Sequence, residues 1–404
     1  MTKLEQLINE LCPNGVEYRT LGEIAVDVFR GAGIKRDEVT ETGIPCVRYG
    51  EIYTTYGVWF DECVSHTVLE NVPSPKYFEH GDILFAITGE SVEDIAKSCA
   101  YVGHEKCLAG GDIVVLKHNQ NPKYLAYALS TTDAQMQKSK GKVKSKVVHS
   151  SVPAIKEIVV PIPPLPVQSE IVRILDNFTE LTAELTAELT AELTARKQQY
   201  VHYTYQLLNF DDTVNTLGLR DLIDFRNGKG HEKDIVGDGK YIVVNSKFIS
   251  TNGEVKKYSN KQICPLYIDD ILMVMSDLPN GRALAKCYLV TEDDKYTLNQ
   301  RIGAFHVKDE SVIITKFLLY VLNRNHQLLR YDNGVDQTNL RKNDILDIMI
   351  PVPLIEEQKR IVAILDRFDT LCNDISAGLP AEIESRQKQY EYYRDKLLTF
   401  EPAK

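Results

Sequence analysis

The stretch from Leu181 to Leu193 limits most strongly what this chain can fold into, because it holds three tandem copies of Thr-Ala-Glu-Leu. Ala, Glu and Leu are strong helix formers, and no Gly or Pro follows Pro166 before Leu208. We therefore expect a helix from near Val167 to about Leu208. At about 1.5 Å per residue it would be about 60 Å long, more than the width of a small domain. Such a helix is expected to act as a spacer.

A second copy of this segment lies near the C-terminus. Residues 158–210 align without a gap onto residues 348–400, and 22 of the 53 aligned pairs are identical. A constant offset over this length indicates a duplicated unit. Gly378-Leu-Pro380 is expected to break or kink the second helix where the first has its uninterrupted repeats.

The segments between the helices are rich in β-branched and aromatic residues and are punctuated by glycine, which is typical of short strands. Short sequence matches between the two segments, such as Thr20-Leu-Gly and Thr216-Leu-Gly, predict that the two domains share a fold. The predicted class is α+β: two similar strand-rich globular domains separated by two long helices, which pack as an antiparallel coiled coil in a pseudo-twofold internal repeat. The expected parts are a first globular domain (1–157, with an N-terminal helix), a central spacer helix (158–210), a second globular domain (211–347) and a C-terminal spacer helix (348–404).

Composition and motifs narrow the function. No apolar run approaches the length of a membrane span, and the N-terminus lacks a signal-peptide pattern, so we expect a cytoplasmic protein without membrane contact. Cys99, His104 and Cys107 lie close in sequence but lack a fourth ligand, so no metal is expected. There is no phosphate-binding loop, glycine-rich cofactor motif or nucleophile elbow. We therefore expect a non-catalytic binding protein that has no cofactor of its own.

The charge distribution is uneven. A net charge of −10 argues against nucleic acid if it is taken over the whole chain. However, five lysines alternate from Lys138 to Lys146, His149 follows, and no acidic residue occurs between Ala134 and Lys156. This run is either a phosphate-binding segment or a solvated loop.

Two divergent globular domains joined by duplicated helices resemble the DNA specificity subunits of type I restriction–modification enzymes, the HsdS family. The resemblance covers essentially the whole chain. The motifs that carry it are the Thr-Ala-Glu-Leu tandem, which resembles the spacer repeat of one subgroup, Ile44-Pro-Cys-Val-Arg-Tyr-Gly-Glu-Ile52, Asp82-Ile-Leu, Leu298-Asn-Gln, and the Pro-x-Pro ahead of Gln168 and Gln358.

The resemblance implies two target-recognition domains, each reading one half of a split double-stranded DNA site. It also implies two modification (methyltransferase) subunits docked along the helices, and restriction (translocase/endonuclease) subunits beyond them. S-adenosylmethionine, ATP and Mg would then belong to those partners. Two alternatives are a coiled-coil scaffold that does not bind DNA, and a stand-alone DNA methyltransferase or nuclease that lacks recognisable motifs.

Phosphate contacts need basic side chains, and base edges are read by Arg, Lys, Asn or Gln. The candidates for DNA contact in the first domain are Lys35, Arg36, Arg48, Tyr49, Lys138, Lys140, Lys142, Lys144 and Lys146. Those in the second are Arg226, Lys229, His231, Asn245, Lys247, Arg282, Gln337, Asn339, Arg341 and Lys342. The alternative interpretation of each candidate is an exposed polar loop residue that does not contact DNA.

The helices carry three further groups of candidates. The spacer leucines are Leu181, Leu185, Leu189 and Leu193. The candidates for partner binding are Gln199, Tyr200, Tyr203, Gln389, Tyr390 and Tyr393, because a duplicated surface suits two identical partners. The expected inter-helix core is Ile171, Ile174, Leu175, Phe178 and Leu181, with Ile361, Ile364, Leu365, Phe368 and Leu371.

The tandem repeat also has a geometric interpretation. Four residues advance a helix by about 6 Å and turn it by about 40°. One base pair advances DNA by about 3.4 Å and turns it by about 35°. One repeat unit would therefore shift a domain by something near one base-pair step, close in angle and poorer in rise, as a ruler would. The alternative is a surface helix without this role.

Overall fold

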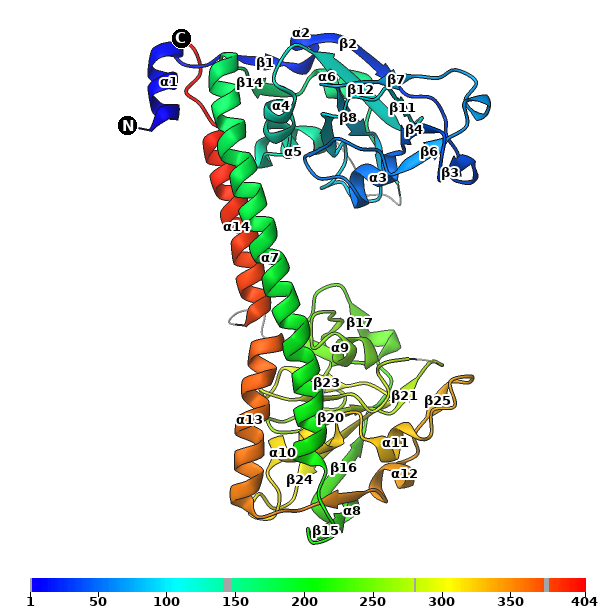
Figure 1. Ribbon diagram of the computed structural model, residues 1–404. Coiled ribbons are helices and arrows are strands. Elements are labelled where there is room, and N and C mark those ends of the chain that lie inside the picture. Colours follow the sequence, from blue (N-terminus) through cyan, green and yellow to red (C-terminus); the bar gives the residue numbers. More distant parts are fainter. Residues whose placement is uncertain (1, 141–146, 280, 374–377) are drawn as a thin grey trace. The chain divides into compact units, whose positions relative to one another are not determined.

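The computed structural model describes residues 2–140, 147–279, 281–373 and 378–404 (Figure 1). The chain forms two compact units, Met1–Thr190 with Glu382–Lys404, and Ala191–Ala381. The boundary falls inside α7 (Leu165–Leu208), a single helix of 44 residues. This is the long helix expected from the sequence. Each unit thus combines a globular domain with parts of both helical segments, whereas the sequence-based division treated the helices as separate parts.

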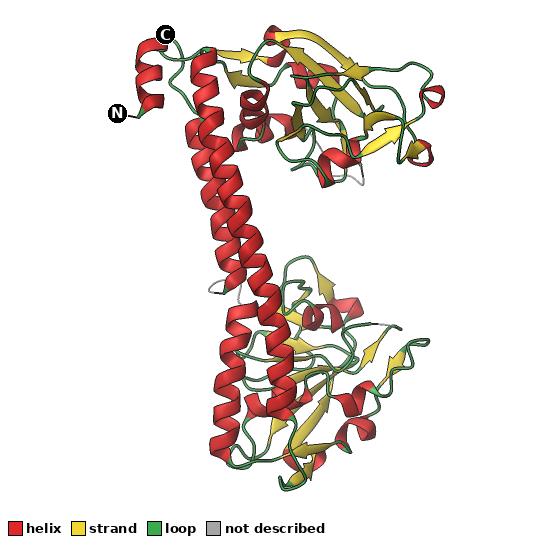
Figure 2. Cartoon of the chain, in the orientation of Figure 1, coloured by secondary structure: helices red, strands yellow, loops and turns green. Residues whose placement is uncertain are grey.

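The first unit contains two five-stranded sheets, with the strand orders β2-β12-β8-β10-β5 and β3-β6-β4-β11-β7, and two small two-stranded sheets, β1-β14 and β9-β13. Figure 2 shows the strands in yellow and the helices in red. The strands are β1 (Tyr18–Thr20), β2 (Ala25–Arg30), β3 (Val39–Thr40), β4 (Ile44–Val47), β5 (Trp59–Phe60), β6 (Ser65–Thr67), β7 (Tyr77–Phe78), β8 (Ile83–Ala86), β9 (Thr88–Gly89), β10 (Ser98–Tyr101), β11 (Cys107–Ala109), β12 (Ile113–His118), β13 (Val148–His149) and β14 (Val159–Pro161). The helices are α1 (Lys3–Leu11), α2 (Leu21–Ile24), α3 (Tyr49–Thr54), α4 (Pro122–Leu129), α5 (Thr132–Ser139), α6 (Val152–Lys156) and α14 (Leu379–Leu397), with short 3-10 turns at Arg36–Glu38 and Leu69–Asn71.

The second unit repeats this plan with sheets β16-β24-β20-β22 and β17-β19-β18-β23 and small sheets β15-β26 and β21-β25. Its strands are β15 (Thr216–Gly218), β16 (Ile223–Asn227), β17 (Ile235–Val236), β18 (Tyr241–Val244), β19 (Tyr258–Ser259), β20 (Ile271–Val274), β21 (Ser276–Asp277), β22 (Cys287–Leu289), β23 (Tyr296–Leu298), β24 (Ile302–Val307), β25 (Thr338–Asn339) and β26 (Met349–Pro351). Its helices are α8 (Leu219–Leu222), α9 (Ser246–Ser250), α10 (Thr315–Leu322), α11 (His326–Leu329), α12 (Lys342–Leu346) and α13 (Ile355–Asn373), with a 3-10 turn at Glu232–Asp234. The predicted pair of similar strand-rich domains is confirmed.

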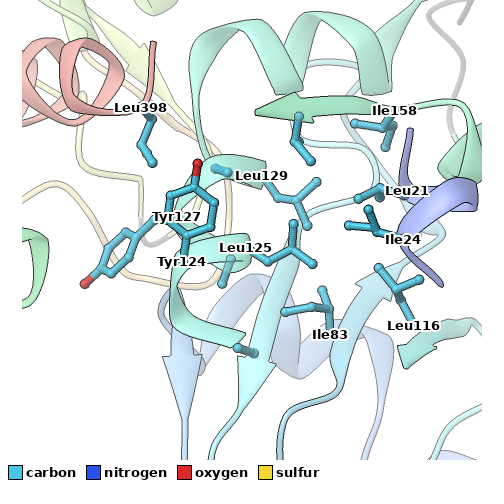
Figure 3. Close-up of a cluster of buried hydrophobic side chains, with 14 of the residues drawn as sticks. Leu21, Ile24, Ile83, Leu116, Tyr124, Leu125, Tyr127, Leu129, Ile158 and Leu398 are labelled. Atoms are coloured by element: carbon cyan, nitrogen blue, oxygen red, sulfur yellow. The ribbon is translucent and has the colours of Figure 1, made fainter. Parts of the chain in front are cut away.

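The central strand of each domain supplies two hydrophobic cores, because successive side chains point to opposite faces of a sheet. In β8, Ile83 and Phe85 pack with the helices, whereas Leu84 and Ala86 pack toward the second sheet. Figure 3 shows the helix-side core, where Ile83 lies among residues of α2 and α4. The strand β20 repeats the alternation, with its odd-numbered residues in one core and its even-numbered residues in the other.

Each unit contains an antiparallel helix pair (Figure 1). In the first unit, Phe178 of α7 stacks on Tyr393 of α14, with ring centroids 6.1 Å apart. In the second unit, Phe368 of α13 stacks on Tyr203 of α7 at 5.4 Å. Phe178 and Phe368 are equivalent at the offset of 190, as are Tyr203 and Tyr393. The two pairs therefore use the same contact with the roles of the duplicated segments exchanged.

The predicted interruption of the second helical segment is confirmed, since α13 ends at Asn373 and α14 begins at Leu379. The expected inter-helix core is correct only in part. Phe178 and Phe368 contact the other helix of their pair. Ile171 and Leu175, however, belong to the core of the first domain, and Ile361 and Leu365 to that of the second, where α4 and α10 leave apolar faces to be buried.

Two duplicated polar contacts fix each helix to its domain. The buried amide of Gln168 accepts from the backbone N–H of Asn121 at 2.9 Å and donates to the carbonyl oxygen of Pro163 at 2.7 Å. Gln358 likewise accepts from Ile314 at 2.9 Å and donates to Pro353 at 2.9 Å. The second contact joins a helix aspartate to a tyrosine and a lysine of the domain: Asp176 with Tyr127 and Lys123, and Asp366 with Tyr320 and Lys316.

Candidate nucleic-acid interface

Two small two-stranded antiparallel sheets occupy equivalent places in the two domains. We call β9 with β13 the first arm, and β21 with β25 the second arm. Each arm joins the residues that follow the central strand to the residues that precede a short helix, α6 or α12. His149 pairs with Thr88 in the first arm, and Asn339 pairs with Ser276 in the second. Because the arms match in topology and differ in their side chains, they are candidates for domain-specific recognition.

Hydrogen bonds join the paired residues of each arm. Thr88 Oγ1 and His149 Nδ1 lie 3.2 Å apart, and His149 is exposed. Ser276 Oγ lies 2.6 Å from Asn339 Oδ1 and 2.8 Å from Gln337 Nε2. Gln337 and Asn339 are exposed, whereas Ser276 is buried. The expectation drawn from the sequence included both amides but missed Ser276 and Thr88. Short hydroxyl residues in a strand give no signal of this kind before the pairing partner is known.

A glycine-containing turn supports a second group of candidates. In the first domain a Cβ on Gly31 would collide with the backbone of Gly110, and in the second a Cβ on Gly228 would collide with that of Asn299. Only glycine permits this close approach. Lys35 and Arg36 follow the first turn and Lys229 lies in the second, and all three are exposed. The two turns therefore hold basic side chains at the surface of both domains.

Other candidates are engaged within their own domains. Arg48 forms an ion pair with Glu51 at 3.4 Å, while Tyr49 beside it is 39% exposed. Arg226 forms an ion pair with the fully buried Asp270, and the guanidinium compensates the buried negative charge. Asn245 caps α9 by accepting from the N–H of Phe248 at 2.9 Å. Side chains that remain exposed are Lys140, Lys247, Arg282, Arg341 and Lys342.

Two expected DNA contacts are wrong. Lys138 is 5% exposed, and its ammonium donates to the carbonyl oxygen of Leu129 at 2.8 Å and to Ser98 Oγ at 3.2 Å. Burial lowers the pKa of Lys138 to about 7. His231 is 1% exposed, and its Nε2 lies 2.9 Å from Thr297 Oγ1. Both side chains point into the fold, so neither can reach a phosphate or a base. Lys142, Lys144 and Lys146 lie outside the described residues.

The helix candidates divide into tyrosines that contact the other helix of a pair and glutamines that do not. Tyr200 and Tyr203 stack on Phe368, and Tyr390 shares a hydrogen bond of 2.9 Å with Thr179, so the tyrosines contribute to the helix pairs. Gln199 and Gln389 are exposed and accept from Arg196 and Arg386 respectively. Of the spacer leucines, Leu189 is buried, Leu185 and Leu193 are half-buried, and Leu181 is 64% exposed. Leu181 therefore lies outside the expected core.

The described residues contain no group of three or more His, Cys, Asp or Glu side chains placed to hold a metal ion. Cys99 and Cys107 belong to the core between the two sheets of the first domain. Within the same part of the chain, no helix is both long and apolar enough to cross a membrane.

Residues 13–195 and 212–385 match the family described as the type I restriction modification DNA specificity domain. The chain is 35% identical over 300 residues to the EcoR124I/EcoR124II specificity subunit of Escherichia coli, covering 69% of this chain and 70% of that protein. It is 34% identical over 276 residues to a putative type I restriction enzyme specificity subunit of Haemophilus influenzae, covering 64% and 68%.

Solved structures show the same fold. A chain from a study of type I R-M system assembly and conformational transition has a TM-score of 0.68 and 15% identity, covering 96% of this chain and 98% of that one. The HsdS subunit of Thermoanaerobacter tengcongensis has a TM-score of 0.53 and 16% identity, covering 96% of each chain. The family match spans both globular domains and most of both helical segments, and so this chain belongs to the type I restriction–modification DNA specificity family.

Proposed function

We propose that this chain is the non-catalytic subunit that selects the DNA target of a cytoplasmic type I restriction–modification complex. Each globular domain reads one half of a split double-stranded site. Two modification subunits bind along the helices, and restriction subunits bind beyond them. S-adenosylmethionine, ATP and Mg are bound by those partners. The observation that carries this proposal is the pair of arms, which have the same topology in both domains but different polar side chains.

The exposed surface of the helices supports binding of two like partners. Glu192, Arg196 and Gln199 of α7 recur in α14 as Glu382, Arg386 and Gln389. In both copies the arginine bridges the glutamate and the glutamine, at 3.4 and 3.0 Å in the first and at 3.3 Å each in the second. A surface that occurs twice can bind two identical subunits by the same contacts.

We further propose that the Thr-Ala-Glu-Leu tandem sets the gap between the half-sites. The tandem lies in α7, which runs without interruption from one compact unit into the other. A change in the number of repeat units therefore changes the length of the helix between the parts of α7 that pack on each domain.

Methylation mapping tests the proposed function. The chain is co-expressed with its modification subunit in a host that lacks DNA methylation, and the genome is sequenced for methyladenine. A motif of two short half-sites around a fixed non-specific gap is expected. A continuous motif would contradict the two-domain mechanism. Absence of methylation, in a complex shown to assemble, would favour the scaffold that does not bind DNA.

A further inference from the structure

Ser276 organises the second arm around a single hydroxyl group. Its Oγ is 2.6 Å from Asn339 Oδ1 and 2.8 Å from Gln337 Nε2. A serine hydroxyl has one proton to donate and lone pairs with which to accept. Ser276 therefore donates to Asn339 and accepts from Gln337. This arrangement directs the amino group of Asn339 and the carbonyl oxygen of Gln337 away from the hydroxyl, as one donor and one acceptor.

The two amides lie on one face of the arm. Residues two apart in an extended strand point to the same side. The residue between them, Thr338, is 9% exposed, whereas Gln337 and Asn339 are exposed. Together with Tyr331, Asp336 and Arg341 they line a hollow of about 320 Å³.

The backbone on both sides of these amides is held by side-chain hydrogen bonds. The carboxylate of Asp277 accepts from the N–H groups of Leu278 at 2.9 Å, Ala283 at 2.7 Å and Leu284 at 3.1 Å. The amide oxygen of Asn333 accepts from Val335 at 2.9 Å and Asp336 at 3.0 Å. A recognition element that is already ordered loses less conformational entropy on binding.

The chemistry of the hollow selects a base edge over the phosphate backbone. The two carboxylates of Asp336 and Asp344 in its lining outnumber the one guanidinium of Arg341, so the charge of the hollow does not favour a phosphate. In the major groove, adenine presents an acceptor at N7 beside a donor at N6, which is the arrangement that an amide donor and an amide acceptor complement. We infer that Gln337 and Asn339, positioned by Ser276, read an adenine in the half-site of the second domain. This inference rests on the proposed function.

The first arm supports this assignment. His149 and Thr88 occupy the places of Asn339 and Ser276 and form the same hydroxyl contact, at 3.2 Å. The side chain that faces outward differs, while the supporting hydroxyl is kept. This is the pattern expected of a position that reads different bases in two half-sites.

Binding of the purified complex, with its modification subunits, to a panel of duplexes tests the inference. The duplexes carry each of the four base pairs at every position of the motif found by methylation mapping. The wild-type complex is expected to prefer A·T at one position of one half-site by about 10-fold or more. Asn339→Asp replaces the donor by an acceptor, so that preference should be lost while every other position keeps its own.

Two further variants make the test decisive. Ser276→Ala leaves both amides in place but removes their support, so discrimination should weaken at the same position. Asn343→Asp makes the same change of charge on the exposed face of α12 and should leave all preferences unchanged. Unchanged preferences in Asn339→Asp would overturn the inference, as would an equal loss for all duplexes, which indicates a phosphate contact. Failure of the proposed function is distinct, because the wild-type complex would then yield no split motif.

Discussion

The ammonium group of Lys138 lies inside the first domain, where Leu129 and Ser98 accept its hydrogen bonds. Burial and the nearby guanidinium of Arg394 lower the pKa of Lys138 to about 7, whereas an unfolded lysine titrates near 10.4. Between these values the unfolded chain binds more protons than the folded chain. The stability of the first domain therefore rises with pH across this window, and at pH below 7 the buried charge destabilises the fold.

Replacing Lys138 by Met should remove this pH dependence. Between pH 7 and pH 9, the unfolding free energy of the wild type should rise relative to that of Lys138→Met by roughly 1 kcal/mol per pH unit. Trp59, the only tryptophan, lies in β5 of the first domain, so its fluorescence during urea unfolding reports on the correct unit. Lys140→Met, at an exposed lysine, is the control and should show no such difference. Parallel pH profiles for wild type and Lys138→Met would contradict the assignment.

At the scale of the secondary-structure elements, the buried amides of Gln168 and Gln358 connect each long helix to its domain. Replacing Gln168 by Leu leaves the N–H of Asn121 and the carbonyl oxygen of Pro163 without their partner. Each unsatisfied buried group costs about 1–3 kcal/mol, so for two groups we expect the unfolding free energy, followed by Trp59 fluorescence, to fall by about 2–6 kcal/mol. Ser169→Ala, at the exposed neighbouring position, should change stability by less than about 0.5 kcal/mol. Equal stability of the two variants would show that the contact is dispensable.

Periodicity and repetition were sufficient to predict the elements themselves. The Thr-Ala-Glu-Leu tandem predicted α7, and Gly378-Leu-Pro380 predicted the interruption between α13 and α14. The partner of each helix face could not be predicted, because an apolar stripe that packs on a domain has the same spacing as one that packs on another helix. Ile171 and Leu175 show this, since they face the first domain.

The candidate site could be predicted only in part for a related reason. The sequence predicts Gln337 and Asn339 as candidates for DNA contact, but the hydroxyl that orients them is about sixty residues away in sequence and contacts them only when β21 pairs with β25. Conversely, Lys138 belongs to a basic run that is typical of a phosphate contact, yet the turn of α5 that carries it faces the core. Charge in a sequence does not report which way a helix is rotated.

At the scale of the whole molecule, α7 is the element that belongs to both compact units. Its first part packs on one domain through Ile171 and Leu175, and its last turns pack on the other through Leu207 and Leu208. The tandem repeat lies between these anchors, and the residues that make up the two helix-side cores come from outside it. The number of repeat units can therefore vary without disturbing either core.

Deleting Thr186–Leu189, one repeat unit, should leave both half-sites of the methylated motif intact and shorten the gap between them. The deletion removes about 6 Å of helix and about 40° of rotation; the rotation is close to one base-pair step of about 35°, whereas the rise exceeds one step of about 3.4 Å. Inserting a second copy of the same four residues should lengthen the gap by the same amount. Thr186→Ala keeps the helix length and should keep the wild-type gap, so it separates length from local sequence. A deletion variant that methylates the wild-type motif with an unchanged gap would show that the repeat does not set the spacing, and that the helix only connects the domains.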